Sequence, residues 1–317
     1  WINTNNGGKQ AKDIVVGDMV LTHKNRYRPV TKVIPTKDKG DIYRLKIGTR
    51  MTNLHITGNH PVLTNMGWVK VEDLDKTKHL VAVNGQIEHD EKDYIIDMKE
   101  FVDYDFYVED GFIIKKNLGV RADSPDNKYY ARPCEFVELD QDLSWALGLW
   151  FAEGSLSTST TKINGVAKPN GIRLTLNMND GDLGERWIKI MVNKFNVIAQ
   201  SYGSEIVRNG KLNSWFNINV NSVVIGKFFD SFGRGCKIKQ IPEWMLSSTK
   251  ENLQAFLDGI LAGDGTEKKD MVSLTLSNPV LALQVYQIGL ILGHDMSLQM
   301  QEKAGKLSTT QYVYIVG

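Results

Sequence analysis

The sequence is poor in cysteine, in long apolar runs and in net charge of either sign. Its 317 residues include only two cysteines, Cys134 and Cys236. Two thiols exclude a disulfide framework and a four-cysteine zinc site, and they are more typical of a reducing compartment. No apolar run approaches the ~20 residues of a membrane-spanning helix, and no signal-like segment begins the chain. We therefore expect a soluble intracellular protein without a membrane partner.

The formal net charge is only +1, which excludes a uniformly basic nucleic-acid-binding protein. The charge is unevenly distributed, because residues 1–83 carry +7, residues 84–142 carry −9 and residues 143–317 carry +3. An acidic run usually forms a solvated connector, whereas the flanking basic parts could each contact an anionic polymer. The length predicts two folded units, and a start at Trp1 instead of methionine suggests a piece of a longer protein.

The first 83 residues are strand-like, with apolar and polar positions alternating between Gly, Asn and Pro. Three segments stand in order: residues 2–4, residues 12–22, and a Thr-x-x-His-Pro run at 57–61. Together they resemble the Hint fold of inteins and hedgehog-type autoprocessing proteins. The resemblance implies that His60 protonates the amide nitrogen next to a nucleophilic Cys or Ser, and that Thr57 helps to hold that peptide. A positioned imidazole suits this proton donation.

The chain departs from that family at both ends. It has no Cys or Ser before Ile2, and it stops at Gly317 without a closing His-Asn dipeptide. The resemblance therefore predicts an incomplete, all-β Hint-type domain over residues 1–83. Whether the chain splices stays open at this point.

A second pattern occurs twice in the rest of the chain. Residues 143–154 and 253–265 are both typical of an apolar helix that ends in a carboxylate followed by Gly. Each helix also has two small residues four positions apart: Gly148 and Ala152, and Gly259 and Gly263. Small residues at this spacing allow two helices to pack unusually closely. We expect the Gly after each carboxylate to end its helix in the left-handed conformation.

The carboxylates that end these helices are Glu153 and Asp264. A helix C-terminus disfavours an anion by ~0.3 to 1 kcal/mol, and close packing of the helices would add mutual repulsion. A divalent cation would relieve both effects. Two carboxylates with the carbonyls of the last helical turns form a ligand set that suits Mg²⁺, with Mn²⁺ as an alternative. A metal there could activate water and stabilise the leaving oxygen in phosphodiester hydrolysis.

The repeated helix resembles the motif of the double-motif LAGLIDADG homing endonucleases. The resemblance covers about residues 136–317 and implies an α+β domain of two pseudo-symmetric αββαββα-like repeats, about 136–235 and 236–317. It implies a monomer that makes a metal-dependent double-strand break in DNA, with Glu153 and Asp264 as catalytic metal ligands. Family members place a catalytic lysine near a Lys-x-Ile-Pro run, which Lys239 matches. For the second half, Lys303 and Lys306 both remain candidates.

Strand-like segments follow the repeated helices, at residues 173–177, 217–221 and 273–277. Further helices are expected at about 180–195, 221–232 and 278–292. The polar positions of the strands are rich in Arg, Asn, Thr and Ser, which suit hydrogen bonds to base edges. Without the paired acids, a solvated sheet face would be the preferred interpretation of this pattern, and the resemblance favours a DNA-binding saddle. The DNA-binding candidates are Arg173, Thr175, Asn177, Asn217, Asn219, Ser273 and Thr275.

These patterns predict a multidomain protein with a Hint-type domain (1–83), an acidic connector (84–135) and an endonuclease domain (136–317). The predicted function is an intein-encoded homing endonuclease, whose partners are double-stranded DNA and the host-protein exteins. Two alternatives stay open: a splicing intein with a decayed nuclease, and a non-catalytic nucleic-acid-binding module on the same fold. The second repeat lacks a closing helix, which suggests a missing C-terminal stretch.

Overall fold

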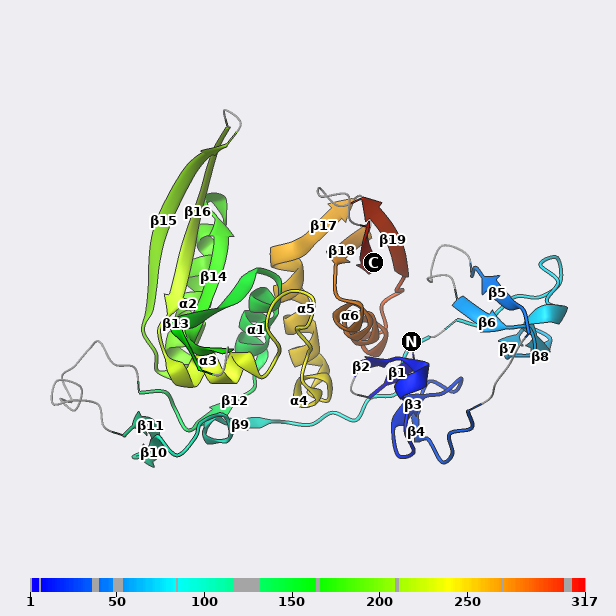
Figure 1. Cartoon of the computed structure of the whole chain (residues 1–317), viewed down its shortest axis with the longest axis horizontal. Coiled ribbons are helices and arrows are strands. Elements are labelled where there is room, and N and C mark those ends of the chain that lie inside the picture. Colours follow the sequence, from blue (N-terminus) through cyan, green and yellow to red (C-terminus); the bar gives the residue numbers. More distant parts are fainter. Residues whose placement is uncertain are drawn as a thin grey trace. The chain divides into compact units, whose positions relative to one another are not determined.

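The structure is a computed structural model that describes residues 2–5, 7–35, 40–47, 54–83, 85–116, 132–163, 166–208, 211–268, 271–304 and 310–316. The chain forms two compact units (Figure 1). The first, here the α6 unit, comprises Trp1–Asp90, Gln240–Ser247 and Thr266–Gly317, and the second, here the α1/α5 unit, comprises Glu91–Lys239 and Ser248–Gly265. No helix among the described residues is long and apolar enough to cross a membrane. The domain boundaries at 83 and 135 stay a prediction.

The described residues of the first part of the α6 unit form strands and short 3-10 turns. One antiparallel sheet has the order β2-β1-β3-β4, from β1 (Ile2–Thr4), β2 (Gly7–Lys9), β3 (Met19–Leu21) and β4 (Tyr27–Pro29). Two hairpins follow, β5 (Ile42–Leu45) with β6 (Leu54–Thr57), and β7 (Pro61–Thr64) with β8 (Gly67–Lys70). The strand-rich character is confirmed, and a Hint-type domain stays a prediction.

The second part of this unit combines a sheet with helices α4 (Glu243–Leu246) and α6 (Pro279–Leu292). The sheet has the order β17-β18-β20-β19, from β17 (Gly265–Lys268), β18 (Met271–Leu276), β20 (Thr310–Val316) and β19 (Leu298–Ala304). Asn278 caps α6 by accepting from two backbone N–H groups of its first turn, and Gly293 ends it at a φ of +84°. Glycine adopts this left-handed conformation without strain.

Helix α6 contains no charged residue, and most of its side chains are buried. A helix without a polar face needs cover on more than one side. The β1–β2 hairpin supplies part of that cover, since a Cβ added at Gly8 would lie 2.2 Å from Leu283 Cδ1. The fully buried Gln284 donates to the carbonyl of Ile241 at 2.8 Å and accepts from its N–H at 2.9 Å. Segments far apart in the sequence therefore share one core around α6.

We expect Gly8→Ala to lower the free energy of unfolding by about 1–2 kcal/mol, because the new methyl group overlaps Leu283. Gly85→Ala is the matched control in the same unit, since an added Cβ there has its nearest contact at 3.5 Å. Its effect should stay within about 0.5 kcal/mol. Urea unfolding gives both free energies, and equal values for the two variants would contradict this packing.

The α1/α5 unit is built around helices α1 (Gln141–Glu153) and α5 (Lys250–Asp264). Asp140 caps α1 by accepting from the N–H of Leu143, and Thr249 caps α5 by accepting from that of Asn252. Acidic and hydroxyl side chains are the preferred groups at this position, because they satisfy backbone donors that the helix leaves open. Both repeated motifs are therefore helices that begin at a capping side chain and end at the carboxylate.

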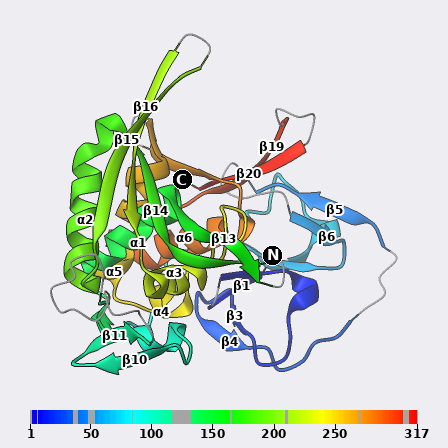
Figure 2. The same cartoon turned by 60° about the vertical axis from the view of Figure 1, so that its left-hand side comes forward.

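An antiparallel sheet follows α1 in the order β13-β14-β16-β15 (Figure 2). Its strands are β13 (Gly154–Ile163), β14 (Val166–Asn177), β15 (Ala199–Arg208) and β16 (Lys211–Val220), with α2 (Gly181–Phe195) and α3 (Val223–Asp230) as its helices. Helix α2 buries Trp187, Met191 and Phe195, which lie four residues apart on one face. The helices predicted at 180–195, 221–232 and 278–292 are confirmed as α2, α3 and α6, and the predicted strands lie in β14, β16 and β18.

Two small antiparallel strand pairs precede α1 in this unit. Strand β9 (Ile95–Asp97) pairs with β12 (Phe136–Glu138), and β10 (Phe106–Glu109) pairs with β11 (Phe112–Lys115). Between them, Phe101 contacts Phe228 of α3 edge to face, with ring centroids 5.1 Å apart. Asp103 pairs with Lys227 of the same helix at 2.5 Å. This part of the predicted acidic connector is therefore packed against α3.

Candidate functional site

Helices α1 and α5 touch through their backbones at two glycines. A Cβ added at Gly148 would lie 2.1 Å from the carbonyl oxygen of Phe256, and one added at Gly259 would lie 2.1 Å from that of Trp145. The contacts are reciprocal, because each glycine meets a carbonyl of the other helix. Only a residue without a side chain allows such an approach. The predicted packing of the two small-residue stripes is confirmed.

This packing carries Glu153 and Asp264 to the same end of the helix pair. Glu153 is the last residue of α1, and Asp264 is the last residue of α5. A Cβ added at Gly263 would lie 2.6 Å from Ala152 Cβ and 3.0 Å from Glu153 Cγ. The Glu153 side chain therefore lies against the α5 backbone immediately before Asp264.

The environment of both carboxyl groups opposes their ionisation. The pKa of Glu153 is raised to about 7, first by burial and then by the negative charges of Asp264 and Asp180. Partial burial also raises the pKa of Asp264, while Lys239 acts in the opposite direction. Clustered acids with raised pKa values are typical of functional sites. Asp180, in the turn before α2, is a neighbour that the sequence analysis missed, because nothing in its local sequence singles it out.

We expect Glu153→Gln to raise the melting temperature by a few degrees at pH 8 in EDTA, and to change it little at pH 4.5. A carboxyl whose pKa is raised by folding destabilises the fold once it is ionised, so this destabilisation develops as the pH rises from the ordinary glutamate value through about 7. Glu185→Gln, an exposed glutamate of α2, is the control. If the difference in melting temperature between Glu153→Gln and the wild type does not increase with pH, the raised pKa of Glu153 is contradicted.

The predicted catalytic lysine, Lys239, lies at the C-terminal end of α1. Its Nζ donates to the carbonyl oxygens of Trp150, Phe151 and Gly154 at 3.0, 3.1 and 2.7 Å. The residue is 3% exposed, and burial lowers the pKa of its ammonium group to about 8. A cation here offsets the negative end of the helix dipole. The expectation that the helix-end carbonyls are free metal ligands is wrong for Trp150 and Phe151, because Lys239 already binds these two. For the other carbonyls of the last turns of α1 and α5 it stays a prediction.

The glycines after the two carboxylates are not left-handed, so that prediction is also wrong. Gly154 has a φ of −89° and Gly265 a φ of −67°. Space is the reason for glycine at both positions. An added Cβ would lie 2.1 Å from Trp150 Cδ1 at the first and 2.3 Å from the carbonyl oxygen of Leu261 at the second. Without a Cβ, the chain passes directly from each helix into a strand.

Glu153 and Asp264 fit one class of metal ion. Among the described residues, no group of three or more His, Cys, Asp or Glu side chains is placed to hold a metal. A pair of carboxylates without imidazole or thiolate does not make a zinc site. It does match Mg²⁺, which takes one or two protein carboxylates and keeps several waters.

The exposed face of the β13-β14-β16-β15 sheet gathers five of the predicted DNA-binding residues. The register places Arg173 opposite Asn219 and Thr175 opposite Asn217. Arg173 Nε donates to Asn219 Oδ1 at 3.1 Å, and Thr175 Oγ1 donates to Asn217 Oδ1 at 2.9 Å. Asn177 has a different role, because its side chain accepts from a backbone N–H of the following turn at 3.0 Å.

The remaining candidates of the second repeat lie in the α6 unit. Ser273 and Thr275 are on β18, where Thr275 is exposed and the Ser273 hydroxyl donates to the carbonyl of Thr266 at 3.5 Å. Lys303 is on β19, but its side chain is outside the described ones, and Lys306 lies outside the described residues. Both lysines stay predictions.

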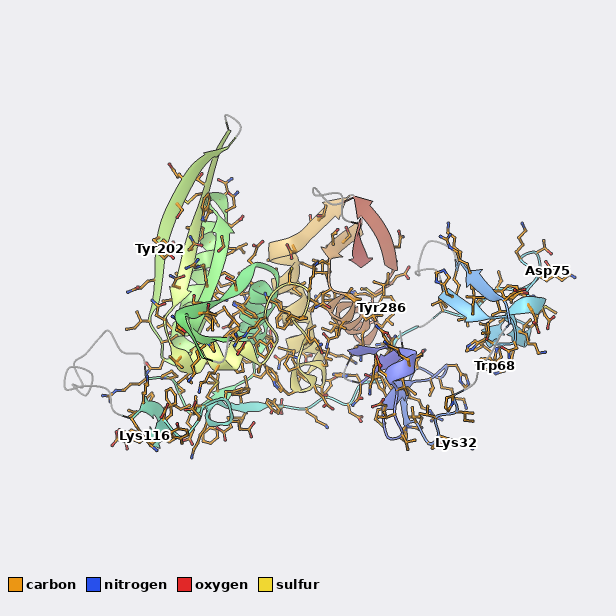
Figure 3. The ribbon with its side chains drawn as sticks, viewed as in Figure 1. Lys32, Trp68, Asp75, Lys116, Tyr202 and Tyr286 are labelled. Carbon is orange, nitrogen blue, oxygen red and sulfur yellow. The ribbon has the colours of Figure 1, made fainter. Side chains whose placement is uncertain are left out.

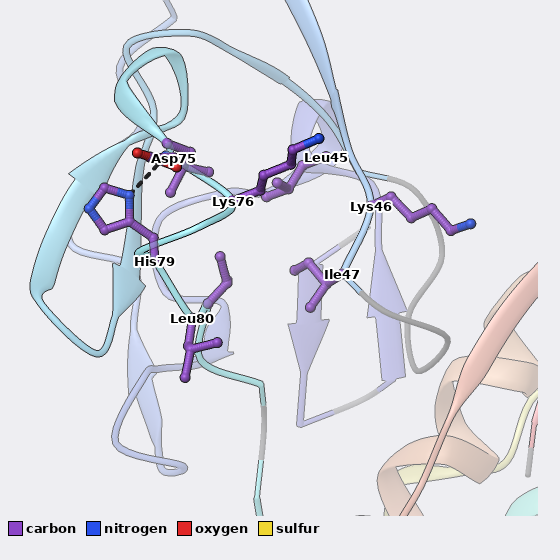
Figure 4. Close-up of a pocket in the computed structure, with 9 residues that line it drawn as sticks. Leu45, Lys46, Ile47, Asp75, Lys76, His79 and Leu80 are labelled. Atoms are coloured by element: carbon purple, nitrogen blue, oxygen red, sulfur yellow. Dashed lines mark hydrogen bonds between the residues drawn. The ribbon is translucent and has the colours of Figure 1, made fainter.

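The predicted splicing residues share one tight turn between β6 and β7. The His60 N–H donates to the carbonyl of Thr57 at 3.1 Å, and the Thr57 hydroxyl donates to Asn59 Oδ1 at 2.7 Å. His60 itself is exposed. A pocket of about 460 Å³ lies elsewhere among residues 45–81, and neither Thr57 nor His60 lines it (Figure 4). In its wall, His79 Nδ1 accepts from the backbone N–H of Asp75 at 2.9 Å.

No known family model matches the chain. It is similar to part of the replication factor C small subunit of Methanocaldococcus jannaschii, 25% identical over 321 aligned residues that cover 94% of this chain and 15% of that protein. It is also similar to part of the ATP-dependent DNA helicase Hel308 of Thermococcus kodakarensis, 22% identical over 343 residues, covering 98% of this chain and 28% of that protein. An uncharacterized protein of M. jannaschii is 44% identical over 57 residues, which are 18% of this chain and 7% of that protein. The chain thus spans less than a third of each relative.

Solved structures similar to the chain include homing endonucleases. Mesophilic variants of I-DmoI are 14% identical, with a TM-score of 0.36 over 56% of this chain and 88% of that chain. I-DmoI in complex with DNA and Mn is 15% identical, with a TM-score of 0.34 over 56% and 89%. I-WcaI bound to its DNA recognition sequence is 13% identical, with a TM-score of 0.35 over 56% and 76%.

Proposed function

We propose that this chain is an intein-type LAGLIDADG homing endonuclease that makes a metal-dependent double-strand break in DNA. The main support is the convergence of Glu153 and Asp264 at the ends of two helices that meet through Gly148 and Gly259. Stability alone does not favour holding two acids together where burial and repulsion oppose their ionisation. A divalent cation, when bound, would supply charge stabilisation and an activated water for phosphodiester hydrolysis.

The residues of the chain divide this task by position. Glu153 and Asp264 would hold the cation, and each would serve the cut on one strand. Lys239 fixes the last turn of α1 through its three carbonyl contacts, and its positive charge lies near both acids, where it stabilises negative charge that develops on the phosphate. The polar sheet face, with Arg173 and Asn219, faces the DNA bases.

Selection from a plasmid library with long randomised inserts tests this proposal. The full chain is incubated with the library in Mg²⁺, and linearised plasmids are recovered and sequenced. The proposal expects linearised molecules that share one sequence, and none in EDTA. Binding without linearisation in either Mg²⁺ or Mn²⁺ would instead favour the decayed nuclease or the non-catalytic nucleic-acid-binding module.

A separate observation favours insertion into a host protein. Nearly the whole chain aligns with short parts of a replication factor subunit and of a helicase, whose names describe different functions. An inserted element that contributes nothing to its host's activity is expected to occur in host proteins of different function. The exteins of such a host are then partners of the chain, and the Thr57–His60 turn carries the splicing residues.

Splicing is tested by His60→Ala in the full precursor with its flanking segments. We expect the unspliced precursor to accumulate on a denaturing gel. His55→Ala is the matched control, because His55 is an exposed histidine of the neighbouring strand β6. Equal amounts of spliced product from both variants would remove the role proposed for His60. No spliced product from the wild-type precursor would remove the splicing proposal and leave the nuclease proposal intact.

A further inference from the structure

The exposed face of the β13-β14-β16-β15 sheet contains two consecutive hydrogen bonds that link side chains of three strands. Arg173 of β14 lies opposite Asn219 of β16, and Tyr202 of β15 lies one row farther along on the same face. Arg173 Nε donates to Asn219 Oδ1 at 3.1 Å, and Asn219 Nδ2 donates to the Tyr202 hydroxyl at 2.9 Å. Figure 3 labels Tyr202 on β15, where it is 44% exposed. No local sequence pattern singles out this tyrosine.

The bond from Arg173 fixes the orientation of the Asn219 amide, and the bond to Tyr202 holds the amide in place. The amide has one acceptor side and one donor side, and these two bonds use the acceptor for Arg173 and the donor for Tyr202. Rotation of the amide by 180° would place a donor against the Arg173 Nε–H and break that bond, whereas the Tyr202 hydroxyl would then donate to Oδ1. The tyrosine hydroxyl therefore acts on Arg173 through Asn219.

The bond at Nε also decides which edge Arg173 presents. A guanidinium can offer either its Nε side or its two Nη groups to a planar acceptor pair. Here Nε is engaged, and among the described residues the Nη groups have no hydrogen-bond or ion-pair partner. A fixed Nη pair matches the O6 and N7 acceptors of guanine in the major groove.

The next row of the sheet has a different character. Thr175 and Asn217 bond to each other, and Asn217 is only 7% exposed. The Thr175–Asn217 pair therefore bonds within itself, whereas the bonds from Tyr202 through Asn219 end at the exposed cation of Arg173. Among the described residues no carboxylate pairs with Arg173. The Nη groups of Arg173 are therefore available to acceptor atoms of a ligand.

We propose that Tyr202 is a positioning residue that, through Asn219, holds Arg173 in the orientation that reads one guanine of the DNA target. This inference rests on the proposed endonuclease function and deepens it. A phosphate contact by Arg173 is the competing outcome, because it would anchor the DNA without reading a base.

The plasmid-library selection tests the proposal with wild type, Arg173→Ala, Tyr202→Phe and Tyr104→Phe. Tyr104 is an 83% exposed tyrosine of the same unit and serves as the control. We expect the wild type to select one invariant guanine that Arg173→Ala loses, by about tenfold or more. Tyr202→Phe should lower the preference at that position several-fold, leave the other positions unchanged and keep the melting temperature of the wild type.

Replacing the selected guanine by 7-deazaguanine provides a readout that a structural role would not move. The modified base lacks N7, so wild-type cleavage should fall, whereas Tyr202→Phe should respond less. An unchanged guanine preference in Tyr202→Phe, or a uniform loss across all positions in Arg173→Ala, would overturn the proposal. If the wild type selects no sequence at all, the proposed function fails and this inference fails with it. That result differs from a wild type that selects a sequence and a Tyr202→Phe variant with the same guanine preference, which would overturn this inference alone.

Discussion

Asp264→Asn should lower the rate of DNA cleavage at least about 100-fold. The substitution keeps the size of the side chain and removes one of the two carboxylates that would hold the cation. It also removes a negative charge that raises the pKa of Glu153, so the remaining carboxyl should ionise at lower pH. The measurement is the single-turnover rate on a duplex recovered from the library, in Mg²⁺.

Asp258→Asn is the matched control for this variant. Asp258 lies on the same helix, is exposed, and accepts from Gln254 at 2.8 Å on the helix surface. Its substitution should leave the rate within about twofold of wild type. Equal rates for Asp264→Asn and Asp258→Asn would show that the end of α5 is not part of the active site.

Gly148→Ala should lower the free energy of unfolding by about 3 kcal/mol, the upper range for overpacking. The added methyl group would lie 2.1 Å from a backbone carbonyl oxygen of α5 and 2.9 Å from a backbone nitrogen. Backbone atoms cannot rotate away as a flexible side chain can, so the helices must separate. Because α1 and α5 carry the two acids, separation should also lower cleavage in the protein that remains folded.

Gly181→Ala, at the start of α2, is the control for the glycine variant. An added Cβ there meets nothing within 4 Å, and alanine in a helix is favoured over glycine by up to about 1 kcal/mol. We expect Gly181→Ala to be neutral or stabilising in thermal unfolding. A Gly148→Ala protein as stable as Gly181→Ala would contradict the backbone contact between α1 and α5.

The parts of the fold that could be predicted from the sequence are those with a regular physical signature. Apolar periodicity and repeated small residues predicted α1 and α5, and their spacing predicted that Gly148 and Gly259 would meet the opposite helix. The alternation of β14 and β16 predicted that Arg173 and Asn219 share an exposed face. Each of these signals lies within a short segment or comes from the similarity of two segments with the same pattern.

The features that sequence reasoning missed depend on contacts between distant segments. No local pattern places Tyr202 beside Asn219, because their contact follows from strand register and a diagonal step across the sheet. The cover of α6 by the β1–β2 hairpin joins segments more than 270 residues apart. Even so, the complete absence of charge in α6 was a signal in the sequence that this helix is covered on several sides.

The most direct test of metal-dependent cleavage by Glu153 and Asp264 is a strand-resolved assay with the wild-type chain. The substrate is a library-selected duplex with a different label on each strand, incubated with Mg²⁺ or with EDTA. We predict one break in each strand in Mg²⁺ and none in EDTA, because Glu153 and Asp264 would act through a bound divalent cation. Two intact strands in Mg²⁺, or equal cutting in EDTA, would contradict this prediction.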